Sequence, residues 1–80
     1  MRKNLVQDHL KGVEQQLLRC EVFLNSVRAN VRTLESNGRD ASEAKELLSS
    51  YVNSRTRLMD LRDRLRTELA QLELSASAAE

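Results

Sequence analysis

The sequence has no proline, no tryptophan, two glycines and a single cysteine in 80 residues. The lack of proline and the scarcity of glycine exclude collagen-like and proline-rich linker proteins. One cysteine cannot form an intramolecular disulfide or a thiolate cluster, which excludes a disulfide-stapled fold and a cysteine-built zinc site. We therefore expect no metal or other cofactor, and a reducing cytoplasm as the compartment.

Charge of one sign and long apolar runs are also lacking. Thirteen Lys and Arg against twelve Asp and Glu leave a net charge of +1, so the electrostatic signature of a DNA-binding protein is missing. The longest apolar run covers residues 22–24, whereas a membrane span needs about 20 residues. Polar side chains interrupt the first residues, so they form no signal-peptide apolar region. We expect a cytoplasmic protein that does not contact a membrane.

What the sequence has is a regular apolar spacing, with alternating steps of three and four residues along the first half of the chain. This spacing is typical of a helix with one heptad seam. The seam positions are Val6, Leu10, Val13, Leu17, Cys20, Leu24, Val27, Val31 and Leu34. Asn4 followed by Gln7 has the spacing of a helix N-cap. The pattern predicts a helix over residues 4–36.

The second half repeats the pattern less regularly. One set of seam positions holds Ala44, Tyr51, Leu58, Leu65 and Leu72, and the other holds Leu47, Ser54, Leu61 and Glu68. The second set is interrupted by two polar residues. We predict a helix over residues 41–73, followed by a tail over residues 74–80 that frays because it has no large apolar anchor beyond its first residue.

Between the two seams lies a turn over residues 37–40. Gly38 tolerates a positive φ and suits the position just after a helix, and Asp40 precedes Glu43 with the spacing of a capping box. A loop this short makes the helices antiparallel neighbours. The predicted fold is all-α, an antiparallel two-helix hairpin in a single domain covering residues 1–80.

An antiparallel register centred on residue 39 is consistent with this hairpin, because it places apolar residues opposite apolar residues. The facing pairs are Leu17 with Leu61, Val13 with Leu65, Cys20 with Leu58, and Val27 with Tyr51. The same register predicts two ion pairs between the flanking positions, Glu14 with Arg62 and Glu21 with Arg55. On the other flank it places Phe23 opposite Arg57, as in a cation–π contact.

Apolar residues outside the seam widen the apolar face of each helix. They are Leu5, Leu18, Val22 and Phe23 in the first helix, and Leu48, Val52, Met59 and Leu69 in the second. A two-helix chain has little stability to spare, so we expect these residues, Leu5 apart, to form the face of a homodimer that closes into a four-helix bundle. The alternative is a monomer on which they are scattered over the surface.

The middle and end of the chain carry a recurrent set of residues. It comprises Leu34, Gly38, Asp40, Ala44, Leu47, Leu48, Arg62-Asp63-Arg64-Leu65 and Glu68-Leu69. Over roughly residues 28 to 70 the chain resembles a group of short helical proteins of unknown role from alphaproteobacteria. The resemblance implies a bacterial cytoplasmic protein, and it brings no catalytic or ligand residue with it.

His9 and Cys20 are the candidates for covalent chemistry. The segment from His9 to Gly12 resembles the phosphoacceptor segment of histidine phosphotransfer domains, but Lys11 and Gly12 follow one residue too early to share the histidine's helical face. Cys20 lies at a seam position, where a cysteine packs as a small apolar residue. The sequence contains no assembled catalytic constellation, and we expect a protein that is not an enzyme.

The segment from Arg55 to Arg66 carries five arginines, and it is the one strong local charge bias. Arg57, Arg64 and Arg66 are the candidate anion contacts. Dimeric hairpins that bind RNA, such as the plasmid-copy-number regulator of the Rop type, resemble the chain in size and topology. However, no aromatic residues that stack on bases lie between the arginines.

These observations favour a non-enzymatic protein-protein interaction module, a small regulator or adaptor, that self-associates and binds a protein partner whose identity the sequence does not give. The alternatives are a Rop-like nucleic-acid-binding hairpin that uses residues 55–66, and a histidine phosphorelay element at His9.

Overall fold

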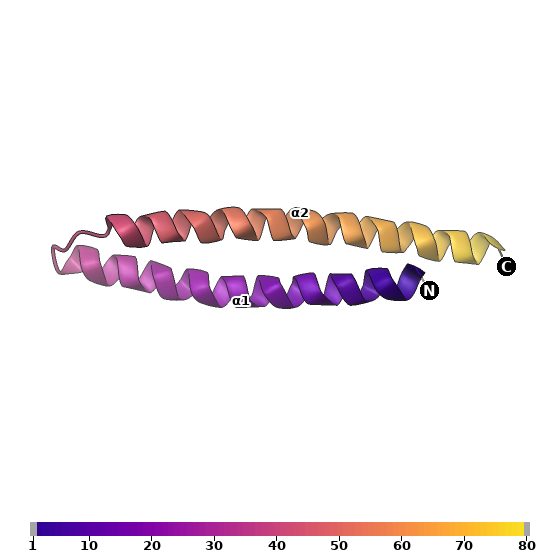
Figure 1. The fold of residues 1–80 in the computed structure, drawn as a ribbon, viewed down its shortest axis with the longest axis horizontal. Coiled ribbons are helices and arrows are strands. Elements are labelled where there is room, and N and C mark those ends of the chain that lie inside the picture. Colours follow the sequence, from indigo (N-terminus) through magenta and orange to yellow (C-terminus); the bar gives the residue numbers. More distant parts are fainter. Residues whose placement is uncertain (1, 80) are drawn as a thin grey trace.

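The computed structural model describes residues 2–79, and the side chains of residues 2–76. Within residues 2–79 the chain forms two helices, α1 (Arg2–Ser36) and α2 (Ser42–Ala79), and no strand. The helices lie side by side and run in opposite directions, so both ends of the chain lie at one end of the molecule (Figure 1). The result is a rod of 66 Å by 14 Å by 14 Å. The predicted two-helix hairpin is confirmed.

The turn begins with a defined end of α1. The Gly38 N–H donates to the Glu35 carbonyl at 3.1 Å, and the Arg39 N–H donates to the Leu34 carbonyl at 2.8 Å. This pair of bonds is the Schellman motif. Gly38 has a φ of +66°, which a residue with a Cβ adopts only at a cost. The position predicted for Gly38 is therefore confirmed.

The start of α2 differs from the predicted capping box. The Ala41 carbonyl accepts the first helical bond, from the Lys45 N–H at 2.9 Å. The Asp40 carboxylate accepts the Ser42 N–H at 3.0 Å and the Ser42 hydroxyl. Because Asp40 lies one residue outside the cap position, its carboxylate reaches Ser42 instead of Glu43. The cap is an Asx turn.

Two helix boundaries are also corrected. α1 begins at Arg2, so Asn4 lies within the first turn and does not cap the helix. α2 continues past residue 73 to Ala79, because residues 74–79 are rich in alanine and contain no glycine or proline to end the helix. Fraying of this tail stays a prediction, and residue 80 lies outside the described range.

The core follows the seam of α1 and forms two clusters. Near the turn the buried residues are Val27, Val31, Ala41 and Ala44, with Leu34, Leu48 and Tyr51 packed against them. Toward the open end they are Val6, Val13 and Leu65, with Leu10, Leu17, Leu58, Leu61, Leu69 and Leu72 packed against them. Cys20 and Leu24 are buried between the clusters, and Leu24 is 0% exposed. All nine predicted seam residues of α1 are buried or half-buried.

The inward face of α2 is rotated from the prediction. Leu47 is 48% exposed, while its neighbour Leu48 packs into the core, and Leu69 packs there as well. The predicted seam contains Ser54 and Glu68, which are polar and gain nothing from burial. In this set of seam positions, the residue that follows each predicted one therefore faces α1. Leu48 and Leu69 were predicted to lie outside the seam, but they pack against the hairpin core as half-buried residues; their part in a dimer face stays a prediction.

Candidate functional site

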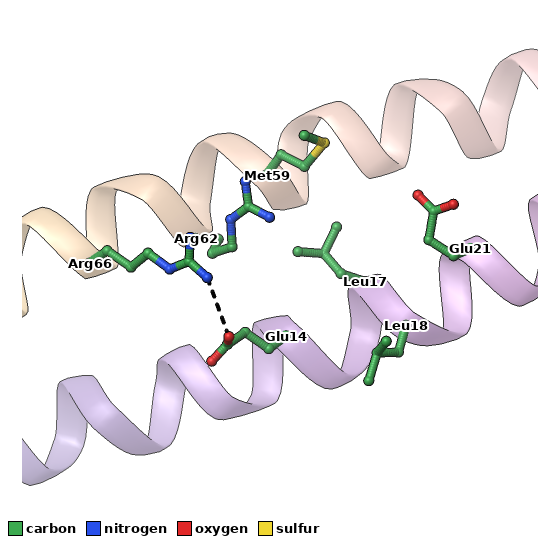
Figure 2. A pocket seen from close by; sticks show the side chains of 7 residues that line it. All are labelled: Glu14, Leu17, Leu18, Glu21, Met59, Arg62 and Arg66. Carbon is green, nitrogen blue, oxygen red and sulfur yellow. Dashed lines mark ion pairs between the residues drawn. The ribbon is translucent and has the colours of Figure 1, made fainter.

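A partly apolar hollow lies between α1 and α2 at about the middle of their length. Its seven lining residues are Glu14, Leu17, Leu18 and Glu21 from α1, and Met59, Arg62 and Arg66 from α2 (Figure 2). We call this hollow the central groove; its volume is about 330 Å³. Leu17 extends from α1 toward α2, while Leu18 is 69% exposed and Met59 is 39% exposed. Apolar side chains thus reach solvent at the groove.

The two edges of the central groove carry opposite charges. The carboxylates of Glu14 and Glu21 belong to α1, and the guanidinium groups of Arg62 and Arg66 belong to α2. Arg66 Nη2 lies 3.5 Å from Glu14 Oε2, and this contact crosses the groove in Figure 2. The groove is therefore acidic along one helix and basic along the other.

The predicted pair of Glu14 with Arg62 is wrong. Arg62 Nε instead lies 3.1 Å from the carboxylate of the adjacent Asp63. The rotation of α2 is the reason: it turns Arg62 toward the helix interface, where the side chain is only 24% exposed. The same rotation leaves Arg66, one turn further along α2, on the flank opposite Glu14.

The other predicted pair forms. Arg55 Nη1 donates to Glu21 Oε1 at 3.1 Å. Lys45 Nζ lies 3.5 Å from Glu35 Oε2, and Glu35 is two heptads after Glu21, so it projects from the same face of α1. Along one flank of the hairpin, acidic residues of α1 therefore face basic residues of α2.

On the opposite flank, the predicted contact of Phe23 with Arg57 is replaced. The ring of Phe23 stacks on the ring of Tyr51, and Arg57 is exposed. Tyr51 lies at the edge of the interface, so its ring covers a face of Phe23 that a guanidinium would otherwise occupy. Nothing in the spacing of the sequence pointed to this stack.

Of the remaining residues predicted for a dimer face, only Phe23 lies apart from the others. Leu18 and Met59 border the central groove, and Val52, which is half-buried, is two turns before Met59 on the same face of α2. Val22 is exposed, one turn from Leu18, and Phe23 is on the other flank. The sequence signal for the groove was the adjacency of Leu17 to Leu18, where one leucine turns toward the seam and the next turns outward.

The three arginines predicted to contact an anion do not converge. Arg57 and Arg64 are exposed and two turns apart on one face of α2, whereas Arg66 is on the groove side with Glu14. Arg64 borders a shallow depression together with Arg2, Asp63, Thr67, Glu68 and Gln71. Two carboxylates in that depression, one of them paired with Arg2 at 3.0 Å, oppose the binding of an anion.

His9 and Cys20 are positioned differently. His9 is exposed on α1. Cys20 is buried, and its thiol donates to the Tyr51 carbonyl at 3.4 Å. Across the described part of the chain, no three His, Cys, Asp or Glu side chains gather in a way that would hold a metal ion.

Neither α1 nor α2, as described, contains an apolar stretch long enough to cross a membrane. Comparison with models of protein families, with curated proteins and with solved structures finds no match.

Proposed function

We propose that this chain is a non-enzymatic protein-protein interaction module, a small regulator or adaptor, and that its first partner is a second copy of itself. The observation that carries the proposal is the number of large apolar side chains that the hairpin leaves exposed. They are Leu5, Leu18, Val22, Phe23, Leu47, Met59 and Leu74.

The thinness of the molecule supports self-association. Each helix buries one stripe against its neighbour, and the rod is only 14 Å thick in two directions. A single layer of two helices leaves the other faces in water, and an exposed apolar face stabilises a protein only when something covers it. Two hairpins packed side by side bury such a face in a four-helix bundle.

The arginine-rich segment, residues 55–66, supports nucleic-acid binding less strongly than the exposed apolar residues support self-association. Arg55 and Arg66 are engaged with carboxylates of α1, and Arg62 is engaged with Asp63. A phosphate backbone would have to compete with these carboxylates, on a chain whose net charge is +1.

The proposal is tested by the mass of the purified full-length chain in solution. Sedimentation equilibrium over a wide range of concentrations should give a species of twice 9.1 kDa, and the thermal midpoint should rise with protein concentration. A mass of 9.1 kDa at every concentration would contradict self-association. A salt-sensitive shift of RNA or DNA in a gel would favour the alternative function instead.

A further inference from the structure

The central groove has the chemistry of a self-complementary surface, and we propose that a second copy of the chain docks there, with α1 of each copy lying against α2 of the other. This inference rests on the proposed self-association and adds the site, the orientation and the charge pairs of the contact. It is carried by the position of the groove, its exposed apolar residues and the arrangement of charge along its two edges.

The groove is placed where two rods can overlap fully. Leu18 lies near the middle of α1, which spans Arg2–Ser36, and Met59 is across the groove from it. A twofold axis parallel to the rods superimposes them along their whole length and keeps Leu18 and the partner's Met59 at one level. One face of the rod, 66 Å by 14 Å, has an area of roughly 900 Å², against about 800 Å² per partner in a stable interface of standard size.

The apolar contact is the first part of the fit. A twofold axis that exchanges α1 with α2 brings Leu18 of one copy over the partner's Met59, and the reverse contact follows by symmetry. Both side chains are exposed in the single chain. The contact therefore covers apolar surface that the hairpin cannot bury by itself.

Charge is the second part of the fit, and it selects the orientation. The α1 edge of the groove carries Glu14 and Glu21, and the α2 edge carries Arg62 and Arg66. When α1 lies against the partner's α2, each acidic edge meets a basic edge. When α1 lies against the partner's α1 about the same level, Glu14 comes beside the partner's Glu21, and this like-charge contact is unfavourable.

The central test uses two variants of the full chain that cannot pair with themselves. One carries Glu14→Arg and Glu21→Arg, so both groove edges are basic, and the other carries Arg62→Glu and Arg66→Glu, so both edges are acidic. We expect each variant alone to dimerise about tenfold more weakly than the original chain or worse, and an equimolar mixture to recover the dimer as a heterodimer.

Arg57→Glu with Arg64→Glu is the matched control, because it makes the same change of charge on exposed positions of α2 away from the groove. This control should leave the dimer intact. Circular dichroism of each variant reports whether the hairpin has formed, so loss of helix is distinguished from loss of the contact.

A second measurement depends on proximity alone. Chains with Leu18→Cys are mixed with chains carrying Met59→Cys and oxidised; a disulfide should join one chain of each kind, and the buried Cys20 of the original chain should not cross-link. Cross-linking of Leu18→Cys chains to one another in preference would overturn the orientation. An original chain that is monomeric overturns the proposed function itself, whereas a dimer that Arg62→Glu with Arg66→Glu leaves unchanged overturns only the groove as its site.

Discussion

Phe23 and Tyr51 stack across the hairpin with their ring centroids 5.5 Å apart and their planes within 4° of parallel. The sequence has one Phe, one Tyr and no Trp, so these two rings are its only Phe, Tyr or Trp side chains. The distance and angle are those of an offset stack, which is worth about 0.5–1.5 kcal/mol beyond the area that it buries. The stack ties the middle of α1 to the first half of α2 on the flank opposite the central groove.

We predict that Phe23 and Tyr51 are energetically coupled. In a double-mutant cycle with Phe23→Leu and Tyr51→Leu, urea unfolding should give a coupling free energy of about 0.5–1 kcal/mol, because each single change already removes the stack. Phe23→Leu combined with Leu65→Ala should be additive, since Leu65 belongs to the other core cluster. Additive effects for Phe23 with Tyr51 would show that the stack does not contribute to stability.

The partner of Glu14 is the subject of the second prediction. A cycle of Glu14→Gln with Arg66→Gln should show a coupling of about 0.5 kcal/mol at low salt, as expected for an exposed ion pair. The same cycle with Arg62→Gln should show none within one chain, because Arg62 contacts Asp63. In 1 M salt, where the screening length is about 3 Å, the Glu14–Arg66 coupling should largely disappear. Coupling to Arg62 alone would contradict the observed pairing.

Periodicity was sufficient to predict α1, the turn at Gly38 and the pairing of the helices. The three-four spacing from Val6 to Leu34 fits one face only, so the buried face of α1 had no competitor. The turn followed from local chemistry, because Gly38 is the one residue near the midpoint that takes a positive φ without strain.

The rotation of α2 was not predictable in the same way. Leu47 and Leu48 are adjacent, and either can continue a seam through Ala44 and Tyr51. The choice depends on how Ser54 and Glu68 are accommodated against α1, which is a property of the packed pair and not of one helix. The groove and the Glu14–Arg66 contact follow from that rotation, so they could not be read from the spacing.

Gly38 and Gly12 lead to a third prediction, in which one substitution has opposite effects at two sites. A Cβ at either glycine would meet nothing within 4 Å, so the backbone decides the sign. Gly38→Ala should destabilise the hairpin by about 1–2 kcal/mol, because φ is +66° there. Gly12→Ala should stabilise it by about 0.5–1 kcal/mol, because Gly12 lies within α1. Thermal unfolding of both variants measures these changes in stability. Changes of the same sign at Gly38 and Gly12 would contradict the assigned conformations.

The fourth prediction concerns pH. The Ser42 hydroxyl and the Ser42 N–H both donate to the Asp40 carboxylate. These two bonds, the hydroxyl's having the larger effect, hold the pKa of the Asp40 carboxyl below its ordinary value of 3.8. Because the folded-state pKa is lowered, the stabilisation is complete above 3.8 and is lost as the pH falls through the folded value. Asp40→Ala should therefore melt below the original chain at neutral pH.

The difference between Asp40→Ala and the original chain should vanish as the pH falls below Asp40's folded-state pKa. Ser42→Ala is the matched control: it removes the hydroxyl but keeps the N–H bond, so it should lower the melting temperature less than Asp40→Ala does. A melting difference that stays constant down to the most acidic pH would mean that ionised Asp40 is not the cause.

Leu24 provides the last prediction, because its side chain is 0% exposed, and it lies between the two core clusters. Leu24→Ala should cost about 2–5 kcal/mol, the range for a buried leucine whose cavity the surroundings cannot close. A rod of two helices has few side chains that could shift to fill the cavity left at residue 24. We therefore expect a cost in the upper part of that range. Leu5→Ala makes the same chemical change at a side chain that is 70% exposed, so it should alter stability by less than about 0.5 kcal/mol. Urea unfolding followed by circular dichroism compares the two, and similar losses at Leu24 and Leu5 would contradict the packing of the helices along this seam.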